Sequence, residues 1–219
     1  PNTAAATRTR AIVEAFSTDG GVTFSTQIVE ALSSSNDRPQ LAIGPDAANL
    51  ATQDAVYVTF KSASGLGVRG AVATGLGSLS SFSAAGYFAT ASTSVNDAVA
   101  SVGPQGQFVV TWSNSTTAEG PGNVFVDRDL NGLVGGFTFG TDIPVSPTEV
   151  GRADLIPASP DRGISASPFL AYDRSGGARD HRLYVAYADA PTTPVDSDNT
   201  NIFVRFSDDH GATWSTAVQ

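Results

Sequence analysis

Oxygen-bearing side chains alternate along residues 127–132, which read Asp-Arg-Asp-Leu-Asn-Gly. Such spacing presents oxygens on one side of a turn that a glycine completes, as at the start of a calcium-binding loop. The EF-hand loop has an acidic residue at its twelfth position, where this chain has Thr138. Two predictions therefore stay open: a calcium site formed by Asp127, Asp129 and Asn131, or a plain turn stabilised by aspartate.

No other group of residues forms a recognisable catalytic constellation. The arginines are scattered along the chain, as are the four glutamates, Glu14, Glu30, Glu119 and Glu149. The two histidines, His181 and His210, stand in predicted turns and form no metal-binding pair. Cysteine is absent, which excludes disulfides and thiolate metal sites. We predict no catalytic residue, and no cofactor besides the calcium considered above.

The chain is acidic, with a formal net charge of −9 over 219 residues, and Lys61 is its only lysine. Nucleic-acid binding needs clustered Lys and Arg to neutralise phosphates, so no nucleic-acid partner is expected. No apolar run approaches the roughly 18 residues of a membrane-spanning helix. Membrane insertion is therefore not predicted either.

Short apolar runs bounded by Gly, Pro, Asn, Asp and Ser recur along the chain, as expected of β-strands joined by turns. Aligning these runs reveals an internal repeat. A small-apolar strand recurs at 39–44, 99–103 and 168–173, an aromatic-ended strand at 56–60, 108–112 and 183–187, and a third strand at 10–16, 68–73, 123–126 and 201–206. The aromatic-ended runs are nearly continuous in apolar residues, which is typical of strands covered on both faces. The repeat predicts an all-β fold.

In two copies of the repeat, the third strand is followed by the same motif, S-x-D-x-G-x-T-[WF]. Its residues are Ser17, Asp19, Gly21, Thr23 and Phe24 in one copy, and Ser207, Asp209, Gly211, Thr213 and Trp214 in the other. An aspartate can accept hydrogen bonds from the backbone N–H groups of a tight turn, and a glycine supplies a positive φ. The aromatic residue can fold back as an apolar plug. We expect these residues to stabilise hairpins.

This motif resembles the Asp box of sialidases and of other BNR-repeat β-propellers. In that family the box joins the third and fourth strands of a blade, away from the catalytic face. The resemblance therefore implies structural roles for the residues of both copies. Residues 127–132 stand where a further, drifted box is due, and Phe137 or Phe139 could replace its aromatic plug.

The resemblance also implies about three and a half β-propeller blades of four antiparallel strands. The predicted blade pieces are 8–30, 36–90, 95–140 and 164–219, and the proline-rich residues 141–163 form an inserted loop. Residues 1–219 are then a single propeller domain or a fragment of one. Because a propeller must close, the remaining blades of a longer chain or a second copy are expected as partners. A β-sandwich is the alternative architecture.

Sialidases clamp the substrate carboxylate with three arginines, the first in an Arg-Ile-Pro-like motif. Here Leu155-Ile156-Pro157 has no arginine in place, so no catalytic residue of that family is carried over. We predict a non-catalytic module of a secreted or cell-surface protein, of the bacterial secreted kind, that binds glycan or protein. The alternatives are a fragment of a sialidase-like glycoside hydrolase and a structural spacer or assembly unit. Exposed aromatic residues, with Tyr87, Phe88 and Trp112 as candidates, would favour the binding module.

Overall fold

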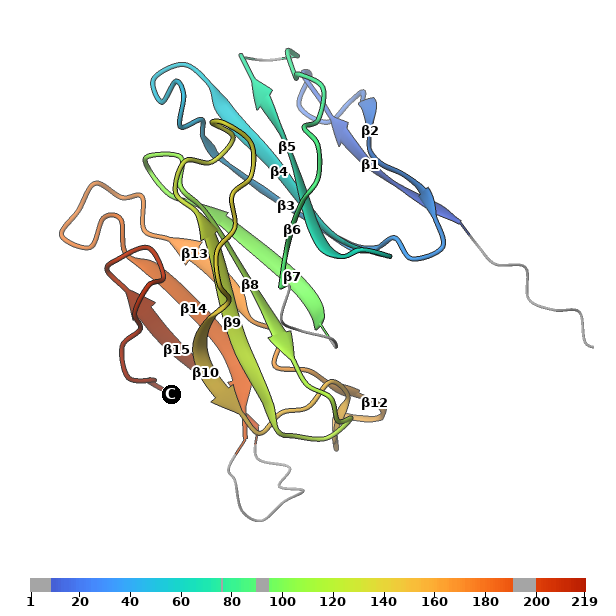
Figure 1. Ribbon diagram of the computed structural model, residues 1–219, viewed down its shortest axis with the longest axis vertical. Helices are drawn as coiled ribbons and strands as arrows, with labels where there is room; N and C mark the ends of the chain where they lie inside the picture. Colours follow the sequence, from blue (N-terminus) through green and yellow to red (C-terminus); the bar gives the residue numbers. More distant parts are fainter. Residues whose placement is uncertain (1–8, 76, 90–94, 191–199) are drawn as a thin grey trace, which may run out of the picture.

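The computed structural model describes residues 9–75, 77–89, 95–190 and 200–219 (Figure 1). Within these ranges the protein consists of β-strands and connecting segments, without a helix. All pairings join the strands in antiparallel sheets of two to four strands, which confirms the predicted all-β class. The described part of the chain accordingly has no helix of the length and apolarity needed to cross a membrane.

The first two sheets come from the amino-terminal part of the chain. The first sheet is a hairpin of β1 (Arg10–Phe16) and β2 (Ser25–Ser33). The second sheet contains β3 (Asp37–Pro45), β4 (Asp54–Ser62), β5 (Gly65–Ala73) and β6 (Gly86–Phe88), paired in chain order. The ends of the predicted pieces 8–30 and 36–90, residues 8 and 90, lie outside the described residues.

The third sheet differs from its predicted extent. It contains β7 (Val95–Val102), β8 (Phe108–Asn114), β9 (Gly122–Asp129) and β10 (Ile143–Thr148) in chain order. The strand β10 lies inside residues 141–163, which were predicted to form an inserted loop, and that prediction is wrong for β10. Pro144 and Pro147 are tolerated there because β10 is an edge strand, with a register shift after Pro144. The rest of the segment carries a small separate hairpin, β11 (Asp154–Ile156) and β12 (Ser159–Ile164).

The fourth sheet contains β13 (Phe169–Tyr172), β14 (Leu183–Asp189) and β15 (Asn201–Ser207). Beyond β15 the chain turns back, and Val204 and Val218 exchange two backbone hydrogen bonds of 2.8 and 2.9 Å. The predicted aromatic-ended runs at 56–60, 108–112 and 183–187 thus fall within β4, β8 and β14, the second strands of their sheets.

The four sheets follow one another in chain order, each facing the next (Figure 1). Alternation along β4 shows how one strand serves two interfaces: Tyr57 packs toward the third sheet, whereas Val58 and Phe60 pack toward the first. In the same way, Trp112 of β8 faces the second sheet and Val109 faces the fourth. The first strands of successive sheets, β3, β7 and β13, lie in contact along one side of the stack.

Candidate functional site

The amino-terminal turn, residues 17–24, joins β1 to β2 through a compact set of hydrogen bonds around Asp19. The backbone N–H and hydroxyl of Thr23 donate to the two carboxylate oxygens of Asp19 at 2.9 and 2.6 Å. The hydroxyl of Ser17 donates to Asp19 Oδ1 at 2.7 Å and accepts from the N–H of Gly21 at 2.8 Å. Gly21 has a φ of +91°, a conformation that favours glycine.

The carboxyl-terminal turn, residues 207–214, repeats this geometry at the end of β15. Thr213 donates its N–H and hydroxyl to Asp209 at 2.9 and 2.7 Å. Ser207 donates to Asp209 at 2.7 Å and accepts from the N–H of Gly211 at 2.7 Å. The same residue types therefore form the same hydrogen bonds in both turns, although the two turns are far apart in the chain.

These hydrogen bonds stabilise the charged form of both aspartates. Donation from Thr23, Ser17 and Val22 holds the pKa of the exposed Asp19 carboxyl well below its ordinary value. Burial acts to raise the pKa of Asp209, but donation from Thr213, Ser207 and Ala212 outweighs it and lowers that pKa to about 2. Both groups are thus built as ionised hydrogen-bond acceptors, and neither has the raised pKa that a general acid requires.

The central turn, residues 127–139, has the same aspartate–threonine hydrogen bonds, but more residues lie between the aspartate and the threonine. Asp129 Oδ2 accepts the N–H and the hydroxyl of Thr138 at 2.6 and 3.2 Å, and Asp129 Oδ1 accepts the N–H of Asn131 at 3.0 Å. Phe139, which follows Thr138, packs against the core between the second and third sheets. Asp129, Thr138 and Phe139 therefore correspond to Asp19, Thr23 and Phe24, with extra residues between the aspartate and the threonine.

The three residues considered for calcium, Asp127, Asp129 and Asn131, line one hollow of about 440 Å³. Both oxygens of Asp129 already accept hydrogen bonds, as does Asp127 Oδ1, which accepts the N–H groups of Arg128 and Gly140. Asp127 Oδ2 is buried and has no hydrogen-bond partner among the described residues, and burial raises the pKa of this carboxyl. It is the atom of the three residues best suited to meet a cation, but no group of three or more acidic, His or Cys side chains gathers around a point among the described residues. Calcium stays a prediction.

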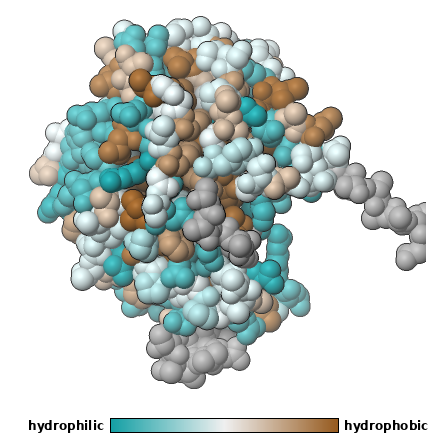
Figure 2. Space-filling view, in the orientation of Figure 1, coloured by the Kyte–Doolittle hydropathy of each residue, from teal (hydrophilic) through white to brown (hydrophobic). Residues whose placement is uncertain are grey.

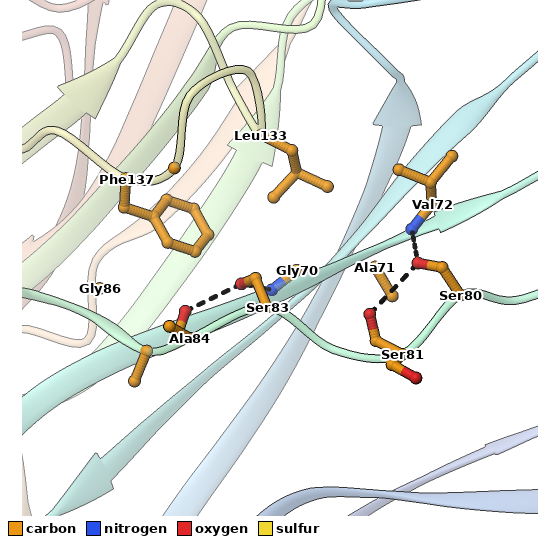
Figure 3. A pocket seen from close by; sticks show the side chains of 12 residues that line it. Gly70, Ala71, Val72, Ser80, Ser81, Ser83, Ala84, Gly86, Leu133 and Phe137 are labelled. Carbon is orange, nitrogen blue, oxygen red and sulfur yellow. Dashed lines mark hydrogen bonds between the residues drawn. The ribbon is translucent and has the colours of Figure 1, made fainter.

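A cleft of about 390 Å³ lies beside the central turn, between residues 131–137 and residues 80–86, which lead from the β5–β6 connection into β6 (Figure 3). Leu133 and Phe137 stand on one side of the cleft, and Ser80 and Ser83 stand on the other. The hydroxyl of Ser83 accepts the N–H of Gly70 at 3.1 Å and donates to the carbonyl of Ala84 at 2.9 Å. The hydroxyl of Ser80 is held in the same manner, accepting from Val72 at 2.9 Å.

The described residues that line this cleft include no charged side chain. They are glycine, alanine, serine, valine, leucine and phenylalanine. Sequence reasoning missed the cleft because its two walls come from loops about 50 residues apart in the chain. The only available signals were the serine-rich run at 78–83 and the apolar residues Leu133 and Phe137, which lie inside a turn where polar residues are the rule.

The aromatic candidates and the arginines lie elsewhere. Phe88 and Trp112 are buried and pack together with ring centroids 5.6 Å apart, so they belong to the core, and Tyr87 is exposed. The arginines with defined partners hold neighbouring strands and turns together, as in the ion pair of Arg69 with Glu30 at 2.8 Å and that of Arg182 with Asp208 at 2.7 Å. These arginines therefore act as separate structural contacts.

No protein-family model matches the sequence, and no curated protein shows detectable similarity to it.

Proposed function

We propose that the chain is a non-catalytic binding module that takes a neutral glycan in the cleft between Ser80, Ser83, Leu133 and Phe137. The cleft is the observation that carries this proposal, because binding sites are concave, mostly apolar and equipped with a few fixed polar groups. Both serine hydroxyls are oriented by backbone bonds and keep a second lone pair for a ligand hydroxyl. Phe137, whose ring stacks on Phe139, is the aromatic side chain of the described lining that the carbon side of a sugar would contact.

The chemistry of the lining separates this proposal from hydrolysis. A glycosidase of the common type needs two carboxylates flanking the bond that breaks, and recognition of a sialic acid carboxylate calls for arginine. The described lining of the cleft offers neither. The substrate class of a sialidase is therefore a poor match, and an uncharged oligosaccharide is a better one.

We further propose that the four sheets are blades of an Asp-box β-propeller in a secreted or cell-surface protein. Consecutive strand order in the second and third sheets supports this, as does the recurrence of one turn after β1, β9 and β15. The stacking of successive sheets in chain order fits blades, and a β-sandwich, which consists of two packed sheets, stays the alternative. The turns then lie at one end of the blades, as the Asp boxes of sialidases do.

A glycan panel tests the binding proposal. We expect saturable binding of neutral oligosaccharides, no preference for sialylated ones, and a loss of about tenfold in affinity for Phe137→Ala, since one stacked ring contributes on the order of 1 kcal/mol. Phe24→Ala removes an exposed aromatic residue that does not line the cleft and is the control. Turnover of a fluorogenic sialoside, or binding that Phe137→Ala leaves unchanged, would contradict the proposal.

A further inference from the structure

The two histidines of the chain, His181 and His210, lie together at one end of the fourth sheet although they are far apart in the sequence. His181 stands near the end of the turn that joins β13 to β14, and His210 belongs to the carboxyl-terminal turn after β15 (Figure 1). Figure 2 shows hydrophilic side chains gathered over this end of the sheet. The two imidazoles are close enough for the charge of His181 to lower the pKa of His210.

Closure of the carboxyl-terminal turn does not account for the imidazole of His210. This residue has a φ of +57°, in the left-handed region that few residues other than glycine adopt. The amino-terminal turn has Gly20 at the corresponding position, with a φ of +74°. That turn forms the same hydrogen bonds between its aspartate, serine and threonine as the turn with His210 does. The side chain of His210 is therefore free to serve another purpose.

His210 lies where the fourth sheet meets the third. Its Nδ1 is 3.2 Å from the hydroxyl of Tyr172 in β13, and the centroids of the two rings are 6.0 Å apart. Arg128 of β9 donates to the backbone carbonyls of Asp209 and His210 at 2.8 and 3.5 Å. A cation of the third sheet thus holds the same segment of backbone that carries the imidazole.

The groups around His210 favour its neutral form. Burial lowers the pKa of His210 most, and the positive charges of His181 and Arg128 lower it further. The carboxylate of Asp209 acts in the opposite direction and is outweighed. The carboxylate of Asp180 lies 3.3 Å from Nε2 of His181 and so faces the other histidine. A proton added to His210 would therefore place a further positive charge beside Arg128 in a partly buried position.

We propose that His210 makes the attachment of the carboxyl-terminal turn to β9 sensitive to mildly acidic pH. At neutral pH the imidazole is uncharged, and Arg128 holds the turn through the carbonyls of Asp209 and His210. Because the attached turn lowers the pKa of His210 from its ordinary value of 6.5, protonation favours conformations in which the turn has moved away from Arg128. The attachment is thus complete above pH 6.5 and weakens as the pH falls below that value. The inference rests on this cluster and is independent of the proposed glycan site.

Intrinsic fluorescence can report the position of the turn. The chain has two tryptophans, of which Trp112 is fully buried in the core, and Trp214 packs beside the turn against residues of the third and fourth sheets. We expect a reversible red shift of the emission between roughly pH 7 and pH 5, at temperatures where the chain stays folded. The melting temperature should fall by about 2 °C or more over the same range.

Two matched variants assign this transition. His210→Asn should remove both the red shift and the fall in melting temperature, because asparagine tolerates the left-handed conformation and does not titrate. His181→Asn, which removes the other histidine from a position with a φ of +71°, should keep both. A red shift that persists in His210→Asn, or one that only His181→Asn removes, would overturn the proposal.

A measurement on His210 itself keeps the proposal testable should a variant fold poorly. In proton NMR spectra, the ring C–H signals of His210 should titrate with a midpoint below 6.5, and the spectrum of His181→Asn assigns them. Arg128→Gln keeps a hydrogen-bond donor but removes the charge, so it should raise this midpoint, which the loss of a purely structural contact would not do. A midpoint at or above 6.5 in the parent chain, or one that Arg128→Gln leaves unchanged, would also overturn the proposal.

Discussion

The amino-terminal and carboxyl-terminal turns have matching internal hydrogen bonds but different surroundings. In both, an aspartate accepts two bonds from a threonine at distances that agree within 0.1 Å. Phe24 at the end of the first turn is nevertheless 61% exposed, whereas Trp214 packs against the core between the third and fourth sheets. The second turn is also held from outside, since Arg128 of β9 donates to the carbonyl of Asp209 at 2.8 Å.

The comparison separates what the motif does locally from what its neighbours add. Side chains of the motif suffice to close the turn, since the exposed turn has the same geometry as the partly buried one. How firmly the turn is attached to the rest of the fold depends on the adjacent sheet. That sheet supplies apolar residues against which Trp214 packs, and it supplies Arg128 as a hydrogen-bond donor. The same sequence motif should therefore contribute unequally to stability at its two positions.

The largest difference is expected for the aromatic residues. Trp214→Ala should lower the free energy of unfolding by about 3 kcal/mol, because it removes a large side chain that packs against the core and leaves a cavity. Phe24→Ala should change it by less than about 0.5 kcal/mol, as exposed substitutions usually do. Urea unfolding followed by circular dichroism measures both. Equal decreases in the free energy of unfolding would contradict this expectation, because they would show that the two aromatic residues contribute equally to stability.

Replacing the aspartates should also destabilise the carboxyl-terminal turn more than the amino-terminal turn. Asp209→Ala leaves the N–H of Thr213 and the hydroxyl of Ser207 without their acceptor in a partly buried turn, which should cost about 2 kcal/mol. Asp19→Ala should also lower the melting temperature, but by less, because water can replace the carboxylate in an exposed turn. Differential scanning fluorimetry of the two variants gives the ranking. An unchanged melting temperature for Asp19→Ala would count against the structural role of the motif.

The cross-sheet contact should have a smaller effect. Arg128→Ala removes the bond to the Asp209 carbonyl and should lower the free energy of unfolding by about 1 kcal/mol. A double-mutant cycle with Asp209→Ala should reveal coupling, whereas a cycle with Asp19→Ala should show additivity. Coupling of Arg128 to Asp19 would contradict the assignment of this contact to the carboxyl-terminal turn.

Acid should weaken the carboxyl-terminal turn without any substitution. Asp209 has a folded-state pKa of about 2, below its ordinary value of 3.8. Its ionised form therefore stabilises the fold fully above pH 3.8, and this contribution is lost as the pH falls from 3.8 toward 2. Asp209→Asn should flatten the stability profile in that window relative to the parent chain. A profile that keeps its slope would show that other carboxyl groups account for the acid sensitivity.

Regularly spaced residues made the strands and the turns predictable from sequence. The roles of Asp19 and Asp209 follow from local spacing alone, because their partners lie within four residues. Features that depend on sheet position do not follow from spacing: the two prolines of β10 predict a loop, and only its place at an edge makes it a strand. The cleft is not predictable from the sequence for a related reason, because its two walls come together only when the second and third sheets stack.

Residues 131–137 of the central turn have a consequence for how this chain can change over evolutionary time. They press Leu133 onto Gly70 and Phe137 onto Gly86, so that a Cβ atom at either glycine would collide with the neighbouring side chain. A shorter turn, like the other two, would remove both obstacles at once. A substitution at Gly86, which would meet the Cβ of Phe137, is thus harmful in the present background but becomes permissible after a deletion in another sheet, and the order in which such mutations arise decides which of them survive.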